Sequence, residues 1–294
     1  MEQNRDLVGK TIVITGATAG IGRAALRAMA ARGAYVIGVG RSPARCQESK
    51  QAILAEAPYA RIDFAVADLS SQRQVRNLAD SIRDYVESSG GGKIDALVNN
   101  AGTVSSWYTA TEDGYELQFA VNYLAAFLLT HKVMPLLEKA PSARIVTVSS
   151  SSHYGTKMRW EDVMYRKRYN ILKAYKQSKL ANVLFSAEVN RRLGTASRIR
   201  AYAVDPGLVS TQIGLKGTSG IEDWVWRQRM EGGVSPAQGA ETIVFLATDP
   251  SVEGSYEVYW KDCQPKLPSR YAQRTQEADR LWALSERLCG VAPA

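Results

Sequence analysis

Short apolar runs rich in valine and isoleucine alternate along this chain with longer segments that have the period of an amphipathic helix. The runs that predict strands lie at 11–15, 34–40, 61–67, 95–99, 144–150, 198–205 and 255–260. The segments that predict helices lie at 21–32, 44–57, 71–88, 112–137, 174–189, 235–247 and 269–288. Strands that alternate with helices form a parallel sheet with helices on both faces. The expected fold class is therefore α/β, a doubly wound parallel sheet with a C-terminal helical extension.

No internal repeat, low-complexity tract or change of composition divides the 294 residues. One domain is expected over 1–294, somewhat longer than the α/β domains of about 200–250 residues that are common. Its nucleotide-binding and catalytic core is expected at about 8–260, with substrate-side loops at 151–174 and 212–234 and the extension at 265–294.

The composition excludes little by itself. Hydrophobic residues make up 45% and charged residues 22%, as in ordinary soluble globular proteins. The net charge of +8 is compatible with an anionic ligand, a nucleic acid or an acidic membrane surface. The basic residues are scattered, and no recognition motif interleaves them with aromatic residues. No nucleic-acid partner is therefore expected.

The cysteines and the N-terminus indicate the compartment. Cys46, Cys263 and Cys289 are odd in number and widely spaced, with no C-x-x-C pair, which argues against a disulfide framework or a zinc site and fits a reducing compartment. The first ten residues are too polar for a signal peptide. No apolar run approaches the length of a membrane span. We expect a soluble, cytoplasmic protein without a metal site.

The stretch TGATAGIG, at 15–22, joins the first predicted strand to the first predicted helix. Glycines there let the backbone approach a pyrophosphate, whose charge is met by the amides and dipole of the helix N-terminus. The spacing G-x-x-x-G-x-G departs from G-x-G-x-x-G, and a glycine turn can also simply join a strand to a helix. The strand–turn–helix context favours a Rossmann-like dinucleotide site. The cofactor-binding residues expected in this turn are Gly16, Thr18, Gly20, Ile21 and Gly22.

The end of the second predicted strand indicates which dinucleotide is bound. An acidic residue there binds the ribose 2′-hydroxyl, whereas a nearby arginine accommodates a 2′-phosphate. The sequence GRSPAR has Gly40 where the acid would stand, followed by Arg41. This pattern favours NADP(H) over NAD(H); the alternative is an ordinary surface arginine in a turn.

Two further strand ends offer cofactor contacts. Asp68, followed by Leu69, can accept a hydrogen bond from an adenine amino group, or can cap the next helix. The motif NNAG places Asn100, Ala101 and Gly102 at the carboxyl edge of the sheet, where ligands bind in open α/β folds. Asn and Gly are also common turn residues.

The segment AYKQSKLANVLFSAEV suggests proton transfer. Tyr175 and Lys179 are four residues apart, so they share one face of the predicted helix. A phenol titrates near pH 10, and a fixed ammonium nearby lowers that value toward the range useful for acid–base catalysis. Tyr169 and Lys173 have the same spacing but are predicted to precede the helix. The run 149–152 supplies four serine hydroxyls at the same sheet edge, and carbonyl chemistry needs such a donor. The residues alone do not select among them.

TGATAGIG, NNAG, the strand-end serines, YKQSK and DPGLVST occur in this order, and from about Val8 to Tyr259 the chain resembles the short-chain dehydrogenases/reductases. The resemblance implies that Ser150 binds the substrate carbonyl and that Tyr175 is the general acid/base. Lys179 would bind the nicotinamide ribose and lower the tyrosine pKa. Asn122, in FAVNYLAAF, would hold a proton-relay water, although a helix-surface amide is the alternative. The remaining cofactor contacts that it implies are Val148, Pro206, Gly207, Val209 and Thr211, with Thr211 near the carboxamide.

YxxSKLANVLF, TEDGYELQFAVN and the tail from Asp262 to Gly290 are similar to the retinol dehydrogenase-like subgroup. Many animal retinol dehydrogenases begin with a membrane anchor, whereas this sequence begins almost directly at its first predicted strand. The usual H-P-G reads Asp205-Pro206-Gly207, which is expected to alter the local electrostatics. Both departures bear on retinoid specificity more than on the chemistry.

The interval between Ser150 and Tyr175 is long for this family and mixes aromatic with basic residues. It is interpreted first as a solvated loop. The alternatives are a wall of the substrate site, as the subgroup implies, and a membrane-surface patch made by Arg159, Arg166, Lys167 and Arg168. Trp224 and Trp226 follow the nicotinamide-closing segment and either line an apolar substrate pocket or simply pack.

The expected function is an NADP(H)-dependent oxidoreductase that reduces an apolar aldehyde or ketone, or oxidises the alcohol. The alternative is an NADP(H)-binding regulatory or sensor protein with little turnover. The intact set of Ser150, Tyr175, Lys179 and Asn122 favours the enzyme, because a sensor has no need of a proton donor. The partners expected are a small apolar carbonyl or alcohol substrate and, from the family, a further copy of the chain in a homo-oligomer.

Overall fold

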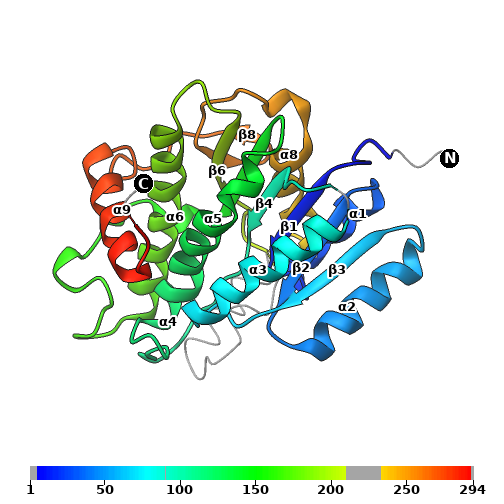
Figure 1. The fold of residues 1–294 in the computed structure, drawn as a ribbon. Coiled ribbons are helices and arrows are strands. Elements are labelled where there is room, and N and C mark those ends of the chain that lie inside the picture. Colours follow the sequence, from blue (N-terminus) through cyan, green and yellow to red (C-terminus); the bar gives the residue numbers. More distant parts are fainter. Residues whose placement is uncertain (1–4, 90, 210–232, 293–294) are drawn as a thin grey trace.

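The computed structural model describes residues 5–89, 91–209 and 233–292. It contains an eight-stranded sheet in the order β3-β2-β1-β4-β5-β6-β7-β8 (Figure 1). Neighbouring strands are parallel, except that β8 runs antiparallel to β7. The chain order reverses between β1 and β4, so this pair forms the topological switch point where open α/β sheets bind ligands. The α/β doubly wound fold predicted from the sequence is confirmed.

The strands are short, apolar and almost entirely buried in the centre of the sheet. Their bounds are β1 (Thr11–Thr15), β2 (Tyr35–Gly40), β3 (Arg61–Val66), β4 (Ala96–Asn99), β5 (Ala143–Val148), β6 (Ile199–Asp205), β7 (Tyr259–Lys261) and β8 (Gln264–Pro265). Burial on both faces is what continuous Val/Ile runs achieve in a parallel sheet. The last strand was predicted at 255–260, but β7 begins only at Tyr259.

Helices cover both faces of the sheet (Figure 1). One core contains residues of α1 (Gly20–Ala31), α2 (Pro43–Glu56) and α8 (Pro236–Thr248). The other contains residues of α3 (Gln72–Ser88), α5 (Ala125–Leu137), α6 (Ile171–Leu193) and α9 (Thr275–Cys289). Short helical turns lie at Leu117–Phe119 (α4), Ala120–Leu124 (η1), Ser151–His153 (η2), Trp160–Asp162 (η3) and Pro250–Val252 (η5).

The long helix predicted at 112–137 starts later than expected and is not uniform. Glu116 caps α4 by accepting hydrogen bonds from the amides of Gln118 and Phe119, so the helix begins at Leu117. A π-helical turn, η1, interrupts it before α5 begins at Ala125. Hydrophobic periodicity does not reveal such a turn, because the inserted residue only shifts the buried face slightly.

By length and composition, Leu117–Leu137 could cross a membrane, and it is the only such helix among the described residues. The expectation that no apolar run approaches that length was therefore wrong. In this structure 72% of the most apolar 18-residue stretch of that helix is buried inside the protein, and many of its residues belong to the hydrophobic core. Its apolar character is accounted for by this position in the core.

Residues beyond β8 form the predicted extension, although its helix begins at Thr275 rather than 269. In α9, Trp282 packs edge-on against Phe127 of α5 and stacks on Phe185 of α6, with ring centroids 5.0 and 6.1 Å apart. Ser285 of the same helix is hydrogen-bonded to the hydroxyl of Tyr123 at 2.6 Å. The tail is therefore part of the core (Figure 1).

Candidate active site

The turn between β1 and α1 lies at the carboxyl edge of the sheet and is shaped by its glycines. Gly16 and Gly20 have φ angles of 69° and 54°, which glycine adopts without steric cost. A Cβ at Gly22 would lie 2.3 Å from the carbonyl oxygen of Gly16 and 2.4 Å from Nδ2 of Asn100, so only glycine fits there. Gly22 thus lets α1 start directly against the turn.

The N-terminus of α1 differs from those of α2, α3, α6 and α8. Each of those helices begins with a serine or asparagine whose side chain accepts a backbone hydrogen bond. The N-cap residue of α1 is Ala19, which has no side chain that could do so, and the first turn has no acidic residue. The free amides and the positive end of the helix dipole are thus available for an anion such as a phosphate.

The end of β2 leaves no room for an acidic residue. A Cβ at Gly40 would lie 2.5 Å from Cγ2 of Thr18 and 2.6 Å from Sγ of Cys46. The next residue, Arg41, has an exposed side chain. A cation therefore follows directly after the position where an acidic residue would bind the ribose of NAD(H).

Thr15 joins the glycine turn to the NNAG motif. Its hydroxyl accepts hydrogen bonds from the amides of Asn100 and Ala101, both at 3.0 Å. The Asn100 side chain donates to the carbonyl oxygens of Thr15 and Gly16 at 2.8 and 3.3 Å. The side-chain amide of Asn100 therefore holds the backbone of the glycine turn in place.

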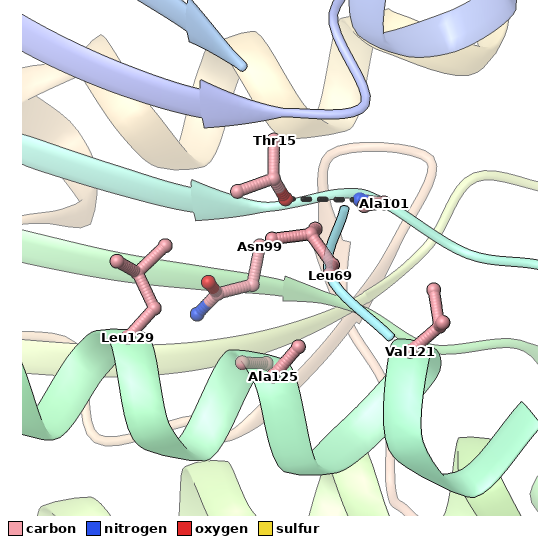
Figure 2. Close-up of a pocket in the computed structure, with 8 residues that line it drawn as sticks. Thr15, Leu69, Asn99, Ala101, Val121, Ala125 and Leu129 are labelled. Carbon is pink, nitrogen blue, oxygen red and sulfur yellow. Dashed lines mark hydrogen bonds between the residues drawn. The ribbon is translucent and has the colours of Figure 1, made fainter. Parts of the chain in front are cut away.

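A small cavity lies below this turn. Figure 2 shows Leu69 and Ala101 on one side of it and Val121, Ala125 and Leu129 of the long helix on the other. The Oδ1 of Asn99 at this cavity is buried without a hydrogen-bond partner among the described residues. Two predicted cofactor residues, Leu69 and Ala101, thus border an apolar slot at the switch point.

Asp68 does not cap α3, so that alternative was wrong. The cap is Ser71, the residue directly before the helix, whose hydroxyl accepts from the amide of Gln74. Asp68 instead accepts from the amide of Ser70 at 2.9 Å, in the loop that leads to the helix. Its adenine contact remains a prediction.

The structure distinguishes the four serines after β5. The Ser149 hydroxyl is buried and donates to the carbonyl of Lys179 at 2.7 Å. Ser151 is exposed, whereas the hydroxyl of Ser152 is buried and has no partner among the described residues. The Ser150 hydroxyl accepts from the amide of Ser152 and is hydrogen-bonded to the side chain of Tyr175. Ser150 is thus the serine that meets the tyrosine.

Tyr175 and Lys179 both lie on α6, and the Lys179 Nζ is 5.6 Å from the centre of the tyrosine ring. Lys179 is only 3% exposed, and its Nζ donates to the carbonyl of Val148 at 3.0 Å. Burial lowers the pKa of Lys179 to about 8, which the charge of Asp205 partly offsets. The ammonium form therefore predominates at neutral pH.

The pKa of Tyr175 is raised overall rather than lowered, and the expected effect of Lys179 on it remains a prediction. Burial, followed by the negative charge of Asp205, raises the pKa of Tyr175 to about 12, while the hydrogen bond with Ser150 acts in the opposite direction. The phenol is therefore protonated at neutral pH.

Tyr169 lies before the first residue of α6, as predicted, although its partner Lys173 is within the helix. Its hydroxyl is 2.6 Å from Nε2 of Gln118 and donates to the carbonyl of Ser105 at 2.9 Å and to a carboxylate oxygen of Glu116 at 3.1 Å. This tyrosine anchors the loop before α6 to the start of α4.

Asn122 lies in η1 and is 2% exposed, so the alternative of a helix-surface amide was wrong. Its side chain accepts from the amide of Thr103 at 2.7 Å and donates to the Thr103 carbonyl and to the Ser178 hydroxyl. Asn122 therefore ties the loop after NNAG to α6. Its role in holding a relay water remains a prediction.

Asp205 is the buried carboxylate of the site. It is 2% exposed and accepts hydrogen bonds from the Gly207 amide at 3.0 Å and the Tyr259 hydroxyl at 3.1 Å. Its charge acts on Tyr175 and Lys179, as the change from H-P-G to D-P-G led us to expect. Pro206, Gly207 and Val209 follow at the same sheet edge, whereas Thr211, Trp224, Trp226 and most of the 212–234 segment lie outside the described residues.

The loop between Ser150 and Tyr175 is not simply solvated. Met158, Met164 and Tyr165 are buried, and the Trp160 indole donates to the Tyr271 hydroxyl and the Glu277 carboxylate of the tail. These residues pack because the tail covers them, a contact that periodicity along the chain does not predict. His153 is also buried, and it could not be singled out from the sequence because a single histidine in a loop carries no motif.

The model of the short chain dehydrogenase family matches residues 10–220. The chain belongs to the short chain dehydrogenase family. Retinol dehydrogenase 12 of Mus musculus is 36% identical over 289 residues, covering 98% of this chain and 89% of its own. Retinol dehydrogenase 13 of Homo sapiens is 33% identical over 290 residues, covering 96% and 85%. These relatives confirm the retinol dehydrogenase-like resemblance.

Among solved structures, an uncharacterized protein from Mycobacterium Paratuberculosis superposes with a TM-score of 0.77 and 31% identity, over 98% of this chain and 96% of that one. A short chain dehydrogenase is an oxidoreductase that transfers hydride between an NAD(P) cofactor and an alcohol or carbonyl group. The glycine turn and the Ser150–Tyr175–Lys179 group lie at the carboxyl edge of the sheet.

Proposed function

We propose that this short chain dehydrogenase uses NADP(H) to reduce a small apolar aldehyde or ketone, or to oxidise the corresponding alcohol. The observation that carries the proposal is the meeting of Ser150, Tyr175 and Lys179 beside a glycine turn whose helix start has no side-chain cap. We also propose that the protein works in the cytoplasm.

The residues present fit a dinucleotide. Gly16 and Gly22 leave space that a Cβ would fill, and the uncapped start of α1 suits a pyrophosphate. Leu69 and Ala101, two of the cofactor contacts expected from the sequence, border a small cavity at the switch point. At the end of β2 the steric exclusion of an acid at Gly40 and the exposed Arg41 favour a 2′-phosphate.

When bound, the nicotinamide supplies the hydride in reduction and takes it up in oxidation. The Tyr175 hydroxyl, protonated at neutral pH, donates its proton to the carbonyl oxygen as the alcohol forms. The Ser150 hydroxyl donates a hydrogen bond to the same oxygen. The Lys179 ammonium stabilises the negative charge that Tyr175 acquires, and a proton from solvent restores the phenol.

Apolar side chains near the serine support an apolar substrate. Tyr154, four residues after Ser150, is 44% exposed, and its hydroxyl is hydrogen-bonded to the carbonyl of Leu267, which is 78% exposed. Leu208, three residues after Asp205, is 48% exposed. Ligand pockets are lined mostly by apolar side chains with a few polar groups, and we propose these residues as part of such a lining. The names of the retinol dehydrogenase relatives agree with this substrate class.

The direct test is to titrate NADPH and NADH by fluorescence and then to follow NADPH absorbance with retinal, aliphatic and aromatic aldehydes, quinones and steroid ketones. Tight NADPH binding with oxidation by one class supports the enzyme and begins to name its substrate. Tight binding without oxidation throughout the panel favours the sensor instead.

Replacing Arg41 with aspartate should weaken NADPH binding by about 10–100-fold, the value of a charge-assisted hydrogen bond, and should change NADH binding much less. Dissociation constants from the same titrations check this. Arg83→Asp makes the same charge change on the exposed surface of α3 and should leave both constants nearly unchanged. An unaltered NADPH to NADH ratio in the Arg41 variant would refute the cofactor assignment.

A further inference from the structure

His153 lies three residues after Ser150 and is completely buried. Its Nδ1 is 2.8 Å from the carbonyl oxygen of Ser150, and its Nε2 is 3.1 Å from the backbone nitrogen of Ser269. One imidazole thus joins the catalytic-serine loop to a segment 116 residues further along the chain. Both bonds are made to the backbone, so neither depends on the identity of a partner side chain.

These two partners define the state of the ring. A backbone amide can only donate, so Nε2 must accept from Ser269 and carries no proton. A carbonyl oxygen can only accept, so Nδ1 must carry the proton and donate to Ser150. The geometry therefore requires neutral imidazole with the proton on Nδ1. A second proton on Nε2 would place it against the Ser269 amide and break that hydrogen bond.

The groups around the ring favour this neutral form. Tyr259 of β7 packs edge-on at 4.7 Å and Tyr154 packs at 4.2 Å between ring centroids. Asp205, at the end of β6, is the charged group that acts on the ring, and its carboxylate is already hydrogen-bonded to Tyr259 and Gly207. Burial outweighs the attraction of Asp205 and lowers the pKa of His153 below its usual 6.5.

We propose that His153 is a positioning residue: as a neutral imidazole it holds the Ser150 backbone to the C-terminal segment at Ser269 and so aims the Ser150 hydroxyl at Tyr175. The inference rests on the proposed function, because that function gives Ser150 its role. It assigns the C-terminal segment a part in catalysis, although no residue of that segment would touch the reacting atoms.

The pH dependence follows from the lowered pKa. In the unfolded chain His153 gains a proton below about pH 6.5, whereas in the folded protein it does so only at lower pH. The stability that the neutral ring contributes is therefore complete above pH 6.5 and is lost as pH falls from 6.5 through the folded pKa. Because protonation releases Ser269, kcat should fall reversibly over the lower part of the same window.

Two substitutions separate the two bonds. In His153→Asn the amide nitrogen occupies the place of Nδ1, so the bond to Ser150 is kept and the Ser269 bond is lost. In His153→Gln the amide oxygen reaches the place of Nε2, so the Ser269 bond is kept and the Ser150 bond is lost. We expect kcat to fall by about tenfold in the Gln variant and by a smaller factor in the Asn variant, with NADPH affinity within about twofold of wild type in both.

The acid side of the pH–rate profile identifies the residue. The chain has two histidines, and His131 of α5 also has a pKa lowered by burial. The acid decline in kcat should persist in His131→Asn and disappear in His153→Asn, because an amide does not titrate. A decline that survives in His153→Asn, or one that vanishes in His131→Asn, would overturn the proposal.

A measurement that does not depend on catalytic activity separates this inference from the proposed function. Long-range 1H–15N spectra of the holoprotein at pH 7, assigned with the His131 variant, should show His153 neutral with its proton on Nδ1. The protection factor of the Ser269 amide, which allows for the slower intrinsic exchange in acid, should fall below the pKa of His153. A proton on Nε2 would refute the link even in an active enzyme. A correct tautomer in a protein that reduces no carbonyl would leave the link standing and remove the proposed function.

Discussion

Tyr175→Phe should lower kcat by about 10²–10⁴-fold, the range that positioned acid–base groups contribute, while leaving the dissociation constant of NADPH nearly unchanged. The substitution removes one oxygen, the atom that donates the proton, and keeps the ring that packs beside Lys179. Steady-state rates of NADPH oxidation with the best carbonyl of the panel, together with fluorescence titration of NADPH, measure the two quantities. A variant that retains the wild-type rate would remove Tyr175 from the reaction.

Tyr169→Phe is the matched control for that experiment. Its hydroxyl is bonded to Gln118, Ser105 and Glu116, whereas Tyr175 is the tyrosine whose hydrogen bond with Ser150 is described above. Losing it should cost about 1–3 kcal/mol in the free energy of unfolding, because it leaves buried polar groups without their partner. The rate should change little in comparison. A loss of rate as large as that of Tyr175→Phe would mean that the wrong tyrosine–lysine pair has been assigned.

Lys179→Met should also abolish most of the turnover, by about 10²-fold or more, because the charge that stabilises the deprotonated tyrosine is removed. The same substitution should nevertheless increase the free energy of unfolding. The wild-type lysine is buried with its charge, whereas methionine fills a similar volume without one. The carbonyl of Val148 keeps its hydrogen bond from Asn182 at 2.9 Å, so no acceptor is orphaned. Steady-state rates test the expected loss of turnover, and denaturant unfolding at pH 7 tests the expected gain in stability.

The pH dependence of unfolding provides an internal check on this variant. The pKa of Lys179 is lowered to about 8 in the folded protein from 10.5 in the unfolded chain. Between these values the unfolded chain binds the extra proton, so the lysine's contribution makes the wild type more stable as pH rises. The stability advantage of the methionine variant should therefore shrink from pH 8 to 10.5. An advantage that is independent of pH would contradict the burial of a charged Lys179.

The strands of the sheet and the motifs at their ends could be predicted because each is set by residues that are close together in the sequence. Apolar runs predicted where β1 to β6 lie along the chain, and the four-residue spacing placed Tyr175 and Lys179 on one helix. The sign of the Tyr175 pKa shift could not be obtained this way. It depends on burial and on Asp205, which lies 30 residues away in sequence and approaches only when β6 packs beside β5.

Contacts between distant segments account for the other differences. The residues alone offered four equivalent serines, and only the folded loop separates Ser149, bonded to α6, from Ser150. The loop before Tyr175 appeared solvated because Trp160 finds its partners in the tail, more than 110 residues later. His153 carried no signal for the same reason, since Ser269 is its partner.

The packing around Gly40 restricts how the proposed preference for NADP(H) could be changed. Exchanging Gly40 for an acidic residue would require Cγ2 of Thr18 and Sγ of Cys46 to yield, because both lie within 2.6 Å of where the new Cβ would stand. Smaller residues at 18 and 46 would have to come first, although neither change would by itself give any benefit in binding NAD(H). The three positions are thus expected to be coupled, because an acidic residue at 40 would need the side chains at 18 and 46 to move or to be smaller.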